Sequence, residues 1–317
     1  MEAYEENTKM KKRPIFNKKQ MRKHIAITLS CFLFMTSCLK EGSEEETIDL
    51  SAPTIKALAG QASVQPEFFF KTDANIREVP VAFTIEDASG IREVKIESHS
   101  GFDGHTHGKS TSARNPKFKL FNHNQVLTVE NFEDEKRFTY NSSIYLDERN
   151  PDLEPDELIL GGPYHFSIQA TDVEGNETTY RDNTTYHTTL YLNKPYAPQV
   201  DFTGTDLTAK RIGGRIFKNP DHEASSDLIF VWVYLQAANS ENPNQEGNIL
   251  KERIWGQSNW PHQFRANGGA PLPDTLELDL FELLGNDTDF LESLGENKLV
   301  VWAEDSFGNI SVNQFNN

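Results

Sequence analysis

Histidine side chains gather in one short stretch of this chain. Residues 99–110 read HSGFDGHTHGKS and hold three of the nine histidines together with one aspartate: His99, Asp103, His105 and His107. Imidazole nitrogen with carboxylate oxygen suits zinc or copper(II), and a His-x-His spacing in an extended segment places both rings on one side. We therefore expect a metal-ion site here. The alternative is a polar, solvated loop that is rich in histidine.

Two further histidines could complete such a site. His123, in the segment FNHNQ, could return from the far side of the segment that follows the loop. His165, which we expect to face solvent on its strand, is a weaker candidate. Glu97 and Glu130 could serve a catalytic metal as general bases, although nothing in their spacing singles them out.

Catalytic motifs are absent from the sequence. It contains no Gly-x-Ser-x-Gly elbow and no phosphate-cradling glycine loop. Of its two cysteines, Cys31 lies in the N-terminal leader described below, and Cys38 is expected to be acylated. We therefore expect a binding protein and not an enzyme.

Two other segments carry side chains that could bind a ligand. DERNPDLEPDE, residues 147–157, has six carboxylates that could gather calcium, but it lacks EF-hand spacing and is expected to be a solvated acidic loop. IWGQSNWPHQFRANGG, residues 254–269, supplies aromatic side chains that could hold a protein or glycan partner: Trp255, Trp260 and Phe264. The alternative for these rings is a satellite core that caps the end of the domain.

An internal repeat indicates the elements that position these residues. YHFSIQATDVEGNET at 164–178 matches NKLVVWAEDSFGNIS at 297–311 with a constant offset of 133 positions. The alternation predicts a strand with one buried face, which leaves Ser167 and Gln169 in solvent. The Asp-x-x-Gly-Asn that follows predicts a capped turn with its glycine at positive φ, although a calcium site at Asp172 and Asn176 is the alternative.

Similar alternation elsewhere predicts strands over 79–87, 89–98 and 227–236, and the best helical candidate is 280–297. We therefore expect an all-β fold of two tandem immunoglobulin-like antiparallel β-sandwiches, each with a long insertion, at about 99–160 and 237–273. The expected divisions are a first domain at 51–193, a linker at 194–198 marked by prolines, and a second domain at 199–317.

The N-terminus predicts export. From Met21, the better initiator, a basic start leads into an apolar run that is too short to span a membrane and ends at MTSC. MTSC resembles the lipobox of Gram-negative (Bacteroidota-type) lipoproteins, with Met35 at the usual leucine position. The resemblance implies that residues 1–37 are removed, that Cys38 is acylated and that residues 38–50 form an acidic tether. LKEGSEEE after Cys38 resembles a signal for the cell surface; a simple solvated tether is the alternative.

The net charge of the chain argues against binding to nucleic acid or to anionic lipid. Residues 1–37 hold eight Lys or Arg and three Asp or Glu, so the remaining chain has 23 basic and 45 acidic residues, a net charge of −22. Such a surface repels nucleic acid and anionic lipid. Attachment to the outer membrane would therefore come from the acyl chains.

FDGHTHG, together with the ATDVEGN hairpin, resembles an uncharacterised family of Gram-negative lipoproteins that have an immunoglobulin-like fold and a His-rich loop. The resemblance covers residues 51–193. It points to metal handling by the first domain and assigns no reaction.

Overall fold

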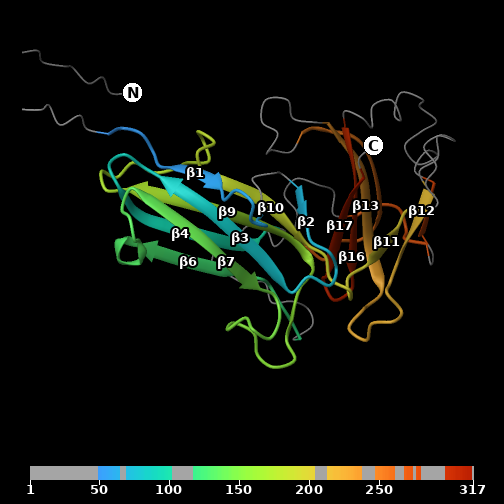
Figure 1. The fold of residues 1–317 in the computed structure, drawn as a ribbon. Helices are drawn as coiled ribbons and strands as arrows, with labels where there is room; N and C mark the ends of the chain where they lie inside the picture. Colours follow the sequence, from blue (N-terminus) through green and yellow to red (C-terminus); the bar gives the residue numbers. More distant parts are fainter. Residues whose placement is uncertain are drawn as a thin grey trace, which may run out of the picture. The chain divides into compact units, whose positions relative to one another are not determined.

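The computed structural model describes residues 49–64, 69–101, 117–203, 213–237, 247–260, 268–273, 276–279 and 297–315 (Figure 1). Residues 49–317 form one compact unit, and the described part of it is built from strands with a single short 3₁₀ helix, η1 (Val129–Asn131). The expected all-β architecture is confirmed. The predicted helix at 280–297 falls outside the described residues except for Asn297, which begins a strand.

The first sandwich consists of a three-stranded and a five-stranded sheet. The smaller sheet has the order β1-β3-β7 and the larger one β2-β10-β9-β4-β6. Their strands are β1 (Thr54–Ala57), β2 (Phe69–Lys71), β3 (Glu78–Glu86), β4 (Ile91–Ser100), β6 (His123–Thr128), β7 (Arg137–Tyr145), β9 (Gly162–Asp172) and β10 (Tyr186–Leu192). Every pair is antiparallel except β2 with β10, and a separate short parallel pair joins β5 (Phe118–Lys119) to β8 (Leu158–Ile159).

The second sandwich repeats this arrangement. Its sheets have the orders β11-β12-β15 and β14-β13-β16-β17. The strands are β11 (Gln199–Asp201), β12 (Gly213–Phe217), β13 (Leu228–Ala237), β14 (Ile249–Gly256), β15 (Leu276–Asp279), β16 (Asn297–Asp305) and β17 (Ile310–Phe315). The order β1-β3-β7 corresponds to β11-β12-β15, and β6-β4-β9-β10 corresponds to β14-β13-β16-β17. The segments expected as insertions therefore contribute regular strands, namely β6, β7 and β14.

Hydrophobic alternation explains the first core. Val79, Val81, Phe83 and Ile85 of β3 are at most 1% exposed, as expected. In β4 the alternation is interrupted by a register shift between Ile91 and Glu93. The Tyr164 hydroxyl, near the start of β9, donates to Leu160 O at 2.9 Å, which resembles the tyrosine corner of β-sandwiches.

One expectation about β9 is wrong. Ser167, expected in solvent, is 5% exposed. Figure 1 shows β9 between β4 and β10, and Ser167 is flanked on these strands by Glu97 and His187. A central strand has neighbours on both sides, so a small side chain is covered by larger ones even on the outer face.

The predicted turns are confirmed in both repeats. Asn176 N–H donates to Asp172 Oδ1 at 2.7 Å, and Asn309 N–H donates to Asp305 Oδ1 at 2.8 Å. The glycines that close them, Gly175 and Gly308, have φ of +93° and +98°. Only glycine adopts this backbone region without steric cost.

The segment expected as a linker, residues 194–198, is largely buried. Lys194 and Tyr196 are 6% and 5% exposed, and the Tyr196 hydroxyl donates to Ile159 O. Burial lowers the pKa of Lys194 to about 8, while nearby Asp147 acts in the opposite sense. Gly161 joins the repeats beside this segment: its N–H donates to Asn309 Oδ1 at 3.2 Å, and its carbonyl oxygen accepts from Ile310 N–H at 2.8 Å.

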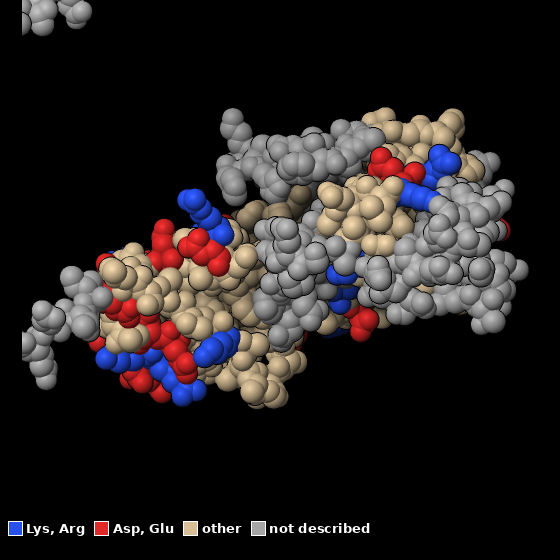
Figure 2. Space-filling model, turned by 90° about the horizontal axis from the view of Figure 1, so that it is seen from above, with Lys and Arg blue, Asp and Glu red and all other residues tan. Residues whose placement is uncertain are grey.

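Surface charge is mixed in sign. Figure 2 shows Lys and Arg side chains interspersed with Asp and Glu side chains on the visible face of the described residues. Glu86, for example, pairs with Lys56 at 3.3 Å and with Arg137 at 3.6 Å. Part of the acidic excess is thus neutralised locally.

Candidate metal site

Two imidazoles meet at the end of the first sandwich where the histidine-rich loop begins. His99 on β4 and His165 on β9 are cross-strand partners in the antiparallel register. Directly opposed residues project from the same face of a sheet. Their ring centroids lie 5.4 Å apart with an interplanar angle of 49°.

This separation suits a shared ion. Two imidazoles that bind one zinc ion tetrahedrally, through nitrogens at roughly 2 Å, have ring centroids about 5 Å apart. The pair therefore needs only a small adjustment to act as two ligands. His165, the weaker candidate from the sequence, is the histidine that the fold places beside His99.

Charged neighbours extend the pair along β4. Glu97 Oε1 lies 3.6 Å from His99 Nδ1, and Glu97 Oε2 lies 2.5 Å from Lys95 Nζ. All three side chains are partly buried on the outer face of the sheet, where period-two alternation places them together.

Glycine at position 101 lets the chain pass closely over His165. Gly101 N–H donates to Pro163 O at 3.0 Å. A Cβ atom at this position would lie 3.2 Å from His165 Nε2 and 3.3 Å from Cδ2. The loop that carries the remaining predicted ligands therefore starts directly against this ring.

The prediction that His123 shares the site is wrong. His123 on β6 is opposite Ser98 on β4, the neighbour of His99 in sequence. Because side chains alternate along a strand, His123 and Ser98 project toward the core face and His99 toward the outer face. His123 Nε2 is buried without a hydrogen-bond partner, and burial lowers the pKa of His123, against a smaller opposing effect of Asp152.

The other predicted ligands, Asp103, His105 and His107, lie outside the described residues, as do Cys38 and Phe264. Within the described ranges, no three His, Cys, Asp or Glu side chains form a group that could hold a metal ion. His99 and His165 could supply two ligands at most, and a complete site would need further ligands from elsewhere.

Sequence reasoning missed His187, which projects from β10 on the same outer face. It is opposite Ser167, one row away from the His165–Thr189 pair. Its ring contacts Tyr180 at a centroid distance of 5.3 Å. The YHTTLYL alternation could have assigned its face, but only the strand order places it near His165.

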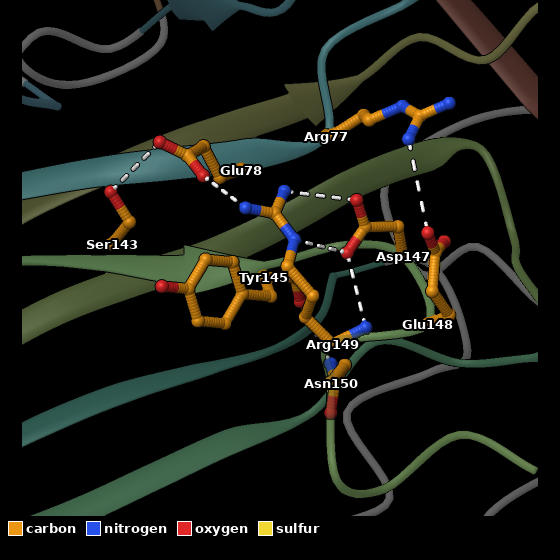
Figure 3. A network of polar contacts seen from close by, with 8 residues as sticks. All are labelled: Arg77, Glu78, Ser143, Tyr145, Asp147, Glu148, Arg149 and Asn150. Atoms are coloured by element: carbon orange, nitrogen blue, oxygen red, sulfur yellow. Dashed lines mark hydrogen bonds and ion pairs between the residues drawn. The ribbon is translucent and has the colours of Figure 1, made fainter.

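Several carboxylates of the acidic loop at 147–157 form ion pairs with Arg or Lys side chains. Figure 3 shows Arg149 between Glu78 and Asp147, with hydrogen bonds of 2.9 Å to each carboxylate and its guanidinium 4.2 Å above the Tyr145 ring. These bonds from Arg149 lower the pKa of Asp147. Glu148 approaches Arg77 at 3.8 Å and Glu157 approaches Lys119 at 3.0 Å. Cations therefore already neutralise three of the carboxylates that calcium would need.

Both tryptophans of the segment 254–269 pack against hydrophobic cores. Trp260 is 6% exposed, and its Nε1–H donates to Gly308 O at 2.9 Å. Trp255, opposite the buried Val231, is partly buried against the core of the second sandwich. The structure therefore favours the capping interpretation over surface rings available to a partner.

Across the described residues, the structure contains no helix with the length and apolar character of a membrane span.

Comparison with known families matches one region of the chain to a domain of unknown function. Residues 37–186 match the model of a domain of unknown function, DUF4625. This range includes β1 to β9 and ends at the first residue of β10. The comparison with curated proteins found no match.

Several solved structures show weak similarity. Escherichia coli α2-macroglobulin in its native conformation is 8% identical over 84% of this chain and 16% of its own, with a TM-score of 0.24. The chain thus spans about one sixth of that protein. The calcium-binding domain CBD12 of CALX1.1 is 11% identical over 74% and 76% of the two chains, with a TM-score of 0.21. The YadV chaperone is 11% identical over 84% and 100%, with a TM-score of 0.19. These TM-scores are too low to support any inference about function. The comparisons therefore establish one feature of the chain, a DUF4625 domain at residues 37–186.

Proposed function

We propose that this chain is a lipid-anchored, non-enzymatic binding protein of the outer membrane. Its first sandwich would bind a transition-metal ion, zinc or copper, through His99, His165 and the loop histidines His105 and His107. The observation that carries the proposal is the His99–His165 pair at 5.4 Å on one sheet face.

The position of the pair supports this function. His105 and His107 follow Gly101 by four and six residues in the sequence, and Gly101 lies against His165. A loop that starts at an imidazole pair and carries two more imidazoles offers the nitrogen-rich ligand set that zinc and copper(II) prefer. The partly buried Glu97 lies beside His99 as a neighbour of the ring and not as a proposed ligand.

Support for the anchor comes from the leader sequence. An acylated Cys38 would tether the sandwiches through residues 39–50, on the cell surface if the acidic run acts as an export signal. Mass spectrometry of the N-terminal peptide should find diacylglycerol on Cys38 and no leader. An unmodified Cys38 that still follows the leader would contradict the anchor without affecting the metal site.

Calorimetric titration of the mature protein with zinc and copper(II) tests the metal site. We expect one ion per chain and an affinity loss of at least about tenfold in either His99→Ala or His165→Ala, since each removes a ligand. His123→Gln is the matched control, because His123 projects from the opposite face. Unchanged affinity in both alanine variants would refute the proposed ligands.

A further inference from the structure

We propose that Glu97 is a positioning residue for His99: it holds the neutral imidazole with its proton on Nδ1, so that Nε2 is the nitrogen presented to a metal ion. This inference rests on the proposed metal function, but the proton position can be measured without any metal. The observation behind it is the carboxylate of Glu97 beside Nδ1 of His99.

Glu97 is itself oriented by the strand. Its Oε2 lies 2.5 Å from Lys95 Nζ, two residues earlier on the same face. The other oxygen, Oε1, lies toward His99, two residues later, at 3.6 Å from Nδ1. Glu97, with 24% of its side chain exposed, is therefore held between a cation on one side and an imidazole on the other.

A carboxylate beside one ring nitrogen determines which tautomer is favoured. An ionised carboxylate only accepts hydrogen bonds, so it attracts a proton on Nδ1 and repels the lone pair that Nδ1 carries in the other tautomer. Histidines that bind metals usually donate their second N–H to such a group, which orients the ring and raises the basicity of the ligating nitrogen. At 3.6 Å the contact is too long for a hydrogen bond, and we expect it to shorten when a cation binds Nε2.

His165 presents its Nε2 in a complementary way. This nitrogen faces Gly101, where any Cβ atom would lie only 3.2 Å away. A side chain larger than that of glycine at position 101 would therefore crowd this nitrogen. We expect Nε2 to be the ligand nitrogen of His165 as well.

Long-range ¹H–¹⁵N NMR correlations of the metal-free mature protein test the proposal. At about pH 8.5, roughly two units above the ordinary histidine pKa, His99 should appear as the Nδ1–H tautomer. In Glu97→Gln the amide can donate as well as accept, so the population should shift toward Nε2–H. Glu93→Gln, an exposed position on the same strand, is the matched control and should leave His99 unchanged.

Metal affinity provides the second measurement. Loss of such an outer partner should weaken zinc binding about 10–100-fold in Glu97→Gln and leave Glu93→Gln at the wild-type value. An Nε2–H tautomer in the wild type, or a tautomer unaffected by Glu97→Gln, would overturn the role of Glu97 whatever the metal result. A wild-type protein that shows the expected tautomer but binds no zinc or copper would refute the proposed function alone.

Discussion

Asp172 and Asp305 occupy the same place in two copies of one turn, yet their carboxyl pKa values move in opposite directions. Both side chains are fully buried and accept from the asparagine four residues later. At Asp172 burial raises the pKa, but the bonds from Asn176 and its neighbours outweigh burial and leave the pKa lowered. At Asp305 burial prevails and raises the pKa to about 6. The turn of Asp305 is the one that contacts the other repeat, where Asn309 accepts from Gly161.

The first prediction follows from this difference. The pKa of Asp305 is raised from 3.8 to about 6 in the folded state. Its contribution to stability is therefore fully present below about pH 4 and is lost as the pH rises through 6. The lost stability amounts to about 3 kcal/mol over this window. Asp305→Asn removes the titration, so the free energy of unfolding of this variant, relative to wild type, should rise with pH.

Asp172→Asn is the matched control for the Asp305 variant. The lowered pKa of Asp172 contributes stability above about pH 4 that is lost as the pH falls, so this variant should lose stability relative to wild type as the pH rises. Urea unfolding measures the Asp305 slope between about pH 4 and 7 and the Asp172 slope below about pH 4. Slopes of the same sign would contradict the opposite pKa shifts of the two carboxyls.

A second prediction concerns Asn193, whose side chain joins the repeats. Its Oδ1 accepts from Val312 N–H at 3.3 Å, and its Nδ2 donates to Val312 O at 3.4 Å. Asn193→Ala should lower the free energy of unfolding by about 1–3 kcal/mol, because buried backbone groups lose their partners. Asn313→Ala, which removes an exposed bond from Lys71, should cost much less. Equal effects in thermal unfolding would contradict this role for Asn193.

Trp260 supports a third prediction. Because its ring is 6% exposed and hydrogen bonded to Gly308, Trp260→Ala should cost about 3–5 kcal/mol of unfolding free energy. Val173→Ala serves as the comparison. Val173 is 47% exposed and lies in the turn of the first repeat that matches the Gly308 turn, so this change should cost well under 1 kcal/mol. A Trp260→Ala protein with the wild-type free energy of unfolding would contradict the core role and favour partner binding by this ring.

His123 yields a fourth prediction. Burial lowers the pKa of His123 below its ordinary 6.5, so the folded state resists protonation and stability is lost as the pH falls through and below 6.5. His123→Gln cannot be protonated and should therefore lose less stability than wild type between pH 7 and 5. Circular dichroism melting at these two pH values measures the effect. An identical acid sensitivity of the two proteins would show that His123 does not contribute to it.

Local chemistry made much of the fold predictable. Alternation identified β3, β4, β9 and β13, because a strand with one buried face needs apolar residues at every second position. The Asp-x-x-Gly-Asn pattern predicted both turns for an equally local reason, since one side chain caps nearby N–H groups and one glycine supplies the positive φ.

The sequence by itself therefore determined the strands, the duplicated turns and the cluster of histidines beside one strand end. Tertiary structure decided which histidines meet. Strand order and register place His165 opposite His99 and put His123 on the other face of the sheet. A register shift of one residue would exchange the two faces. Contact between the repeats, which also buries Lys194, Tyr196 and Asp305, likewise depends on residues far apart in the chain, and no local pattern encodes such packing.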